Sequence, residues 1–164
     1  MAVYRIKAVQ KIPGDMETIW RFFSQPENLA TITPAHFNFR VASQYHGDTI
    51  YPGQIIEYKV SPVAGIPLYW MTEITQVIPQ QLFVDEQRYG PYSMWHHQHH
   101  FVPVTGGVEM TDIVHYKIPY WFIGDLANSL LVGAQLRNVF TYRYKKVEEL
   151  FGKWEGQQMQ LMFS

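Results

Sequence analysis

Histidine is the residue type that most suggests chemistry in this chain, because five of its seven histidines lie between positions 96 and 115. His97 and His99 are separated by one residue, and side chains two apart on a β-strand point to the same face. Asp112 supplies a carboxylate further along the chain. Imidazole and carboxylate groups on a shared face can act as a general acid and a general base, or can orient a ligand through hydrogen bonds.

A glycine pair predicts how these groups are brought together. Gly106-Gly107 is the strongest hairpin signal in the chain, so we expect the strands before and after it to pair. With the two glycines as the turn, Phe101 lies opposite Asp112, and His99 lies opposite Val114. The face predicted to point toward the core holds Trp95, His97, His99, Phe101, Asp112, Val114, Tyr116 and Ile118. The face predicted to point toward solvent holds His96, Gln98, His100, Thr111, His115 and Lys117.

The inward His97, His99 and Asp112 have three alternative uses, which the sequence leaves open. They can form a His–Asp pair beneath a cavity, since a buried polar group without a partner costs about 1–3 kcal/mol. They can contact a ligand or act as catalytic acid and base. They can also bind a metal, because histidine and aspartate suit zinc. The spacing matches no established metal signature, so we predict no metal and no cofactor.

Arg143 is a further candidate, in the C-terminal half of a predicted long helix. An arginine on the covered side of that helix can pair with Asp85 or Asp112, or can bind a ligand carboxylate through two hydrogen bonds. Asp85 and Gln87 share one face of the strand that follows a predicted turn at Pro79-Gln80. The residues themselves leave open whether these two side chains face the interior.

The elements that position these groups follow from periodicity and from proline and glycine. An alternating segment predicts a first strand at 3–12, and Asp15 can cap a helix that runs to Phe23. A second short helix follows, with Pro26 in its first turn. Six further strands are predicted at 37–41, 54–60, 68–78, 82–88, 92–104 and 108–118. Apolar residues at steps of three, four or seven predict a long helix from Gly124-Asp125 to Gly152.

This order of elements predicts an α+β fold with a seven-stranded curved sheet. The connections between the strands from position 37 onward are short, so the sheet is antiparallel. The long C-terminal helix is the only large element left to cover the concave face, and a ligand cavity is expected in the wedge between them. The predicted floor is formed by Trp95, Phe101, Val114 and Tyr116, and the predicted roof by Leu130, Gly133, Ala134 and Phe140.

Short strings along nearly the whole chain carry a family resemblance. They are Pro26-Glu27-Asn28-Leu29-Ala30, Ile32-Thr33-Pro34, Tyr51-Pro52-Gly53, Phe83-Val84-Asp85-Glu86-Gln87, Gly90-Pro91-Tyr92, Trp95 with His97, His99 and Phe101, Met110-Thr111-Asp112 with Val114 and Tyr116, and Phe140 with Arg143. Together with the element order, they resemble the START-like or SRPBCC superfamily, whose fold is called helix-grip, and within it bacterial ligand-binding proteins described as polyketide cyclase/dehydrase-like. The resemblance implies one START-like domain over residues 1–164 and an inward Asp85.

Composition excludes several classes of protein. The chain of 164 residues has no cysteine, which excludes disulfides, thiol nucleophiles and cysteine-ligated clusters, and which fits a cytoplasmic protein. The net charge of −1 argues against a nucleic-acid binder. We find no signal peptide and no apolar run of about 18 residues, so no transmembrane segment is predicted. The oligomeric state is not predicted.

We expect the protein to bind a small hydrophobic molecule without catalysis. Aromatic residues are 16% of the chain and can line a cavity. The apolar connections at 62–67 and 119–124 can close the pocket, pack against the core, or dock on a partner or a membrane. An alternative is a cyclase, dehydratase or hydrolase that uses the inward His and Asp on an aromatic or polyketide-like substrate, so enzymatic activity is left open. A third possibility is an interaction module whose cavity is vestigial.

Overall fold

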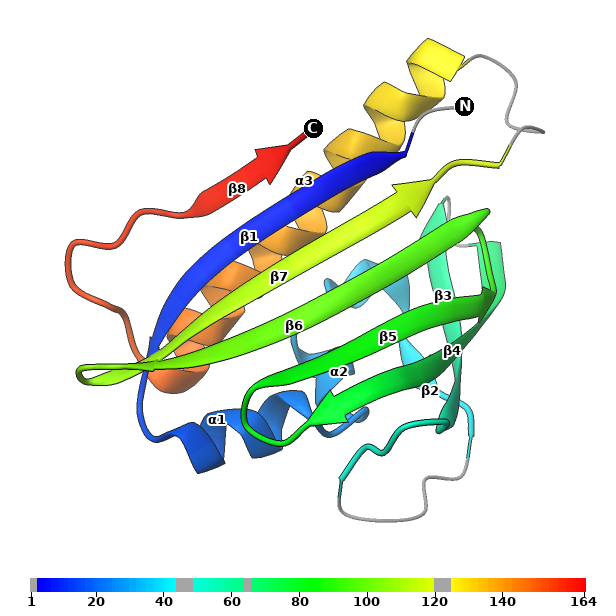
Figure 1. Cartoon of the computed structure of the whole chain (residues 1–164). Helices are drawn as coiled ribbons and strands as arrows, with labels where there is room; N and C mark the ends of the chain where they lie inside the picture. Colours follow the sequence, from blue (N-terminus) through cyan, green and yellow to red (C-terminus); the bar gives the residue numbers. More distant parts are fainter. Residues whose placement is uncertain (1–2, 44–48, 64–65, 120–124) are drawn as a thin grey trace.

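A computed structural model describes residues 3–43, 49–63, 66–119 and 125–164 (Figure 1). The elements in chain order are β1 (Tyr4–Pro13), α1 (Met16–Phe23), α2 (Asn28–Thr31), the 3₁₀ turn η1 (Ala35–Phe37), β2 (Arg40–Val41), β3 (Ile55–Val63), β4 (Ile66–Ile78), β5 (Leu82–Tyr89), β6 (Met94–Val104), β7 (Gly107–Lys117), α3 (Asp125–Phe151) and β8 (Gln160–Phe163). The predicted long helix and most predicted strands are therefore confirmed.

Within the described residues, one antiparallel sheet of eight strands forms the body of the molecule, in the order β2-β3-β4-β5-β6-β7-β1-β8. The prediction of seven strands is wrong, because the chain after α3 returns and adds β8 to β1 at one edge (Figure 1). Four residues are too few to show a clear alternating pattern. The predicted strand at 37–41 is also shortened, because Asn38 adopts a left-handed conformation that ends η1.

The long helix α3 crosses the concave face of the sheet and packs directly on its β1–β7 side (Figure 1). Leu136 and Phe140 of α3 join Ile6, Val114 and Tyr116 in one buried cluster. Burying such side chains stabilises the fold by about 1.5–3 kcal/mol each. This direct contact leaves only a small pocket of about 20 Å³ between α3 and the β1–β7 side, so the large ligand space lies toward the other end of the sheet.

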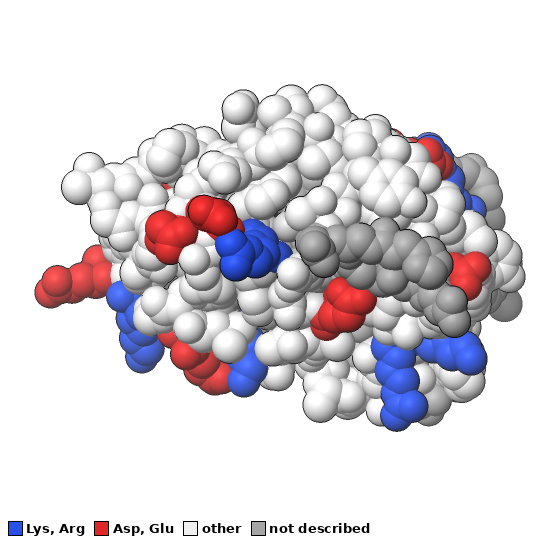
Figure 2. Space-filling view, turned by 90° about the horizontal axis from the view of Figure 1, so that it is seen from below, with Lys and Arg blue, Asp and Glu red and all other residues white. Residues whose placement is uncertain are grey.

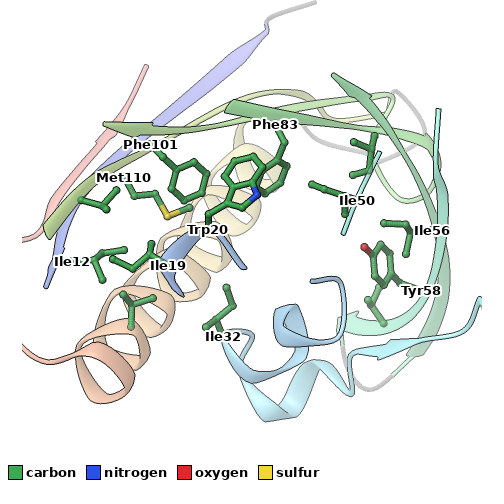
Figure 3. Packing of buried hydrophobic residues seen from close by; sticks show 14 residues of the cluster. Ile12, Ile19, Trp20, Ile32, Ile50, Ile56, Tyr58, Phe83, Phe101 and Met110 are labelled. Atoms are coloured by element: carbon green, nitrogen blue, oxygen red, sulfur yellow. The ribbon is translucent and has the colours of Figure 1, made fainter. Parts of the chain in front are cut away.

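Helix α1 covers a second part of the concave face. Asp15 Oδ1 accepts a hydrogen bond of 2.8 Å from the backbone N–H of Thr18, which caps the helix as predicted. Trp20 then packs edge-on against Phe83 of β5 and Phe101 of β6. Figure 3 shows Trp20 between these rings and the apolar side chains of the same cluster. The helix thereby fixes the inner surface of the strands that carry the histidines.

The predicted faces of the β6–β7 hairpin are confirmed, but the predicted pairing is wrong by two residues. The turn is Thr105-Gly106, so that His99 lies opposite Asp112 and His97 opposite Val114. Gly107 already belongs to β7, where a Cβ atom would collide with the backbone oxygen of Ile12. A shift of two preserves which residues share a face, because side chains alternate with a period of two.

The face of the molecule shown in Figure 2 carries few charged side chains, and neither sign gathers into a continuous patch there. Within the described residues, no helix is both long and apolar enough to cross a membrane.

Candidate ligand-binding site

A cavity of about 240 Å³ lies beside α1, α2 and α3, against the strands β3 to β6. Its apolar lining includes Phe22, Phe23, Leu29, Ile32, Ile50, Ile56, Tyr58, Val60, Leu68, Trp70, Ile74, Phe83, Trp95, Val132, Leu136 and Val139. Ile56 and Tyr58 point inward from β3 across from Ile32 (Figure 3). The cavity is therefore an apolar space within the fold that a small hydrophobic molecule can occupy.

The part of the cavity wall formed by β3 and β4 is built from alternate residues of these two neighbouring strands. Tyr58 of β3 pairs with Trp70 of β4, and Ile56 pairs with Thr72. Since residues two apart share a face, these pairs line the cavity in rows. The alternation is visible in the sequence, and it is the signal by which these wall residues could have been predicted.

Three polar side chains form one part of the cavity wall: Asp85 of β5, and His97 and His99 of β6. The strand pairing places Asp85 directly opposite His97. Asp85 Oδ2 accepts a hydrogen bond of 2.9 Å from His99 Nε2 and lies 3.6 Å from His97 Nδ1. The two imidazole rings lie against each other at a tilt of 37°, with 3.7 Å between their centroids.

Asp112 of β7 lies behind the two histidines and is buried. Its Oδ1 accepts a hydrogen bond of 3.0 Å from His97 Nε2 and lies 2.8 Å from His99 Nδ1, which lacks hydrogen-bond geometry there. Its Oδ2 lies 3.8 Å from Arg143 Nη1, on α3. The predicted His–Asp pairing is thus a four-residue network in which each imidazole lies between two carboxylates, with an arginine at its edge.

The charges of this network compensate one another. Burial alone would raise the pKa of Asp112, but hydrogen bonds and charge from the two histidines outweigh burial and hold this pKa well below its usual value. The pKa of Asp85 is lowered against burial by the charges of His97 and His99. Burial and then the charge of His99 lower the pKa of His97. For His99, the two carboxylates outweigh burial and raise the pKa. The pKa values of the two imidazoles are therefore shifted in opposite directions.

Such a network can hold or transfer a proton, or can direct hydrogen bonds at a ligand. Arg143 is suited to the second role because it lines the cavity and its Nε is buried without a hydrogen-bond partner among the described residues. A buried donor of this kind is available to an acceptor atom on a bound molecule.

Of the predicted site residues, four line the large cavity: Trp95, His97, His99 and Arg143. Four others are buried beside it instead of lining it: Phe101, Asp112, Val114 and Tyr116. The reason is that α3 packs directly against β7, and α1 against Phe101. Asp112 instead lines a small pocket of about 20 Å³ on the other side of the network.

The face of α3 that was predicted to form the roof of the cavity does not line it. Leu130 is 67% exposed, Ala134 is exposed, and a Cβ atom added at Gly133 would contact none of the described atoms within 4 Å. Phe140 packs against the β7 side, away from the large cavity. Among the described side chains of α3, those of Val132, Gln135, Leu136, Val139 and Arg143 line the large cavity.

The sequence left open the roles of Asp85, of Gln87 and of the two apolar connections. Asp85 faces inward, as the resemblance implied. Gln87 instead serves the β5–β6 connection, donating a hydrogen bond of 2.6 Å from Nε2 to the backbone oxygen of Tyr92. Of the two apolar connections, Ile66 is 58% exposed and Pro119 lines the cavity. Positions 64–65 and 120–124 lie outside the described residues, so their role in closing the pocket stays a prediction.

A sequence profile of the family described as polyketide cyclase / dehydrase and lipid transport matches residues 12–156. The chain belongs to this family. The predicted resemblance to SRPBCC proteins is therefore confirmed. No functionally curated protein matches the sequence.

Solved structures of low sequence identity share the family's helix-grip fold. A protein from Chromobacterium violaceum is 14% identical with a TM-score of 0.68, covering 92% of this chain and 99% of its own. The major latex-like protein 151 from Panax ginseng is 13% identical with a TM-score of 0.64, covering 91% of this chain and 97% of its own. A protein from Thermus thermophilus is 16% identical with a TM-score of 0.62, covering 88% and 94%. At this identity the likeness shows the fold alone.

Proposed function

We propose that this protein binds a small, mainly hydrophobic molecule in the cavity, without catalysis. The observation that carries the proposal is the 240 Å³ apolar cavity with a compact polar network in its wall. A cavity of about 150 Å³ holds benzene, so this one suits a molecule larger than a single ring. Burying apolar surface contributes about 25 cal/mol per Å² before the costs of association. The family description, which includes lipid transport, supports the same reading.

The polar network orients the ligand in this proposal. Arg143 Nε offers a buried donor, and Asp85 offers carboxylate oxygens at the cavity surface. A ligand with an apolar body and one polar end matches this distribution of groups.

The absence of cysteine also supports a cytoplasmic location for the protein.

The test compares two substitutions in α3, one that narrows the cavity and one that serves as its matched control. Val139→Phe adds bulk to a lining position of α3, and we expect it to weaken the binding of an environment-sensitive apolar dye at least tenfold. Gly133→Leu adds bulk to the same helix where the structure has open space, so dye affinity should stay within twofold of the wild type. Equal affinities in all three proteins would contradict binding in this cavity. Native mass spectrometry of freshly purified protein would reveal a co-purified molecule.

A catalytic role is the second candidate, favoured by the opposite pKa shifts of His97 and His99. Adjacent titratable groups whose pKa values are driven apart are typical of acid–base pairs. In this alternative, the protein acts on an aromatic or polyketide-like molecule as a cyclase, dehydratase or hydrolase. Turnover in a substrate panel that is lost in His99→Ala, while dye binding persists, would favour the enzyme over the binding protein.

A further inference from the structure

The side chains of Asp85, His97 and His99 have the arrangement of three metal ligands. Each presents a nitrogen or oxygen atom within 4.8 Å of the other two. Asp85 Oδ2 lies 2.9 Å from His99 Nε2 and 3.6 Å from His97 Nδ1. Atoms that bind a tetrahedral zinc ion at about 2.0–2.2 Å lie about 3.4 Å from one another, so the two distances from Asp85 Oδ2 are close to those of a zinc site. We propose that these three residues bind one divalent transition-metal ion, represented in the test by zinc.

The carboxylate of Asp112 supports the two histidines from behind. Its Oδ1 lies 3.0 Å from His97 Nε2 and 2.8 Å from His99 Nδ1, the ring nitrogens opposite to those that approach Asp85. Metal-binding histidines usually donate their second N–H to such a carboxylate, which sets the tautomer and the orientation of the ring. Because His97 Nε2 donates to Asp112, the lone pair of a neutral His97 lies on Nδ1, where the ion is proposed. The sequence suggested Asp112 as the third ligand, whereas the geometry gives that place to Asp85.

The proposed ion has an open side that faces the cavity. Asp85, His97 and His99 all line the large cavity, whereas Asp112 lines only the small pocket behind them. Three protein ligands with a free fourth position are typical of zinc sites that bind exogenous molecules. The ion, two carboxylates and Arg143 leave a single positive charge, so the apolar surroundings favour an anionic fourth ligand such as a carboxylate or hydroxide. Binding of the ion itself does not depend on the proposed organic ligand.

The experiment measures zinc binding to chelator-stripped protein by competition with a chromophoric chelator, and cobalt binding by visible absorption. We expect one ion per chain, with the cobalt absorption of a site that has nitrogen and oxygen ligands. Asp85→Asn, which keeps the shape of the side chain, should abolish stoichiometric binding. Asp112→Asn should weaken binding by about 10–100-fold, the usual loss when the group behind a ligand is removed.

The matched control removes two imidazoles from the outer face of the same strand. His96 and His100 lie on β6 beside the proposed ligands but point away from them, so His96→Ala/His100→Ala should bind zinc within twofold of the wild type. His97→Ala/His99→Ala should not bind. If the wild type fails to bind one equivalent at micromolar zinc, the proposal is wrong. It is also wrong if the outer-face variant loses as much affinity as the inner one, or if Asp85→Asn retains wild-type affinity. Circular dichroism checks that each variant is folded. If His97→Ala/His99→Ala is unfolded, the proposal is judged from zinc binding to the outer-face variant and from the cobalt spectrum of the wild type.

Discussion

At the scale of single residues, Asp112 is the centre of the buried network. It contacts His97, His99 and Arg143 and is itself almost fully buried. Strand pairing brings it opposite His99, so a residue far along the chain becomes the shared partner of two imidazoles. Removing one partner from a buried charged network leaves the others uncompensated, which is strongly destabilising.

Asp112→Ala should therefore lower the free energy of unfolding by about 3–5 kcal/mol, measured by urea denaturation. Glu86→Ala is the control. Glu86 lies one residue from Asp85 on β5 and pairs with His96 on the outer face, where both side chains are 28% exposed. Partly exposed pairs contribute about 0–1 kcal/mol. Similar losses in the two variants would contradict the special position of Asp112.

At the scale of elements, periodicity predicted which residues share a face better than it predicted how elements pair. The hairpin faces are correct because both turn positions, Gly106-Gly107 and Thr105-Gly106, preserve the alternation. The helix was harder, because α3 carries apolar side chains on more than one side, and Leu130 and Leu131 are both about two-thirds exposed. Its contact face is decided by packing against β1 and β7, which no local pattern encodes.

Substitutions of Gly107 and Gly133 should change stability in opposite directions, because Gly107 lies against the backbone of β1 whereas Gly133 lies beside open space. Gly107→Ala forces a Cβ atom against the backbone of Ile12, so we expect a loss of about 1–3 kcal/mol or more in unfolding free energy. The Cβ atom added by Gly133→Ala meets no described neighbour, and alanine favours a helix more than glycine does. We therefore expect a gain of about 0.5–1 kcal/mol in unfolding free energy. Thermal and chemical denaturation of both proteins provide the measurement. A stabilising Gly107→Ala would contradict the contact between β1 and β7 at this point.

The cap of α1 should contribute a measurable pH dependence. The hydrogen bond from Thr18 lowers the pKa of Asp15 below its ordinary value of 3.8. A carboxyl whose pKa is lowered by folding stabilises the protein above its unfolded pKa, and this contribution disappears as the pH falls through the folded pKa. Asp15→Asn keeps a capping side chain without a charge. Its melting temperature should fall less between pH 6 and pH 3 than that of the wild type; an equal or larger fall would exclude this role for Asp15.

At the scale of the whole molecule, the class of fold was predictable and the position of the cavity was not. The order of strands and helices, supported by short family strings, indicates a helix gripped by a sheet. The cavity depends on which part of the sheet α3 contacts, and α3 packs against Ile6 and Val114, so the space opens toward β3 and β4. The chemical groups at its polar end were recognised, since His97, His99 and Arg143 do line it. Asp85 could be assigned only by resemblance.

The two outermost strands have a consequence for how copies of this chain behave toward one another. An uncovered strand edge offers free N–H and C=O groups to which another chain can add, a common route to aggregation. Here the edges are formed by β2, with two residues, and β8, with four, whereas β1 behind β8 has ten. Deleting residues 160–164 would uncover β1, and light scattering should then show more concentration-dependent association than for the chain that keeps these residues. The four residues of β8 thus occupy the edge of β1 at Ile6–Val9, where a strand of another molecule could otherwise pair.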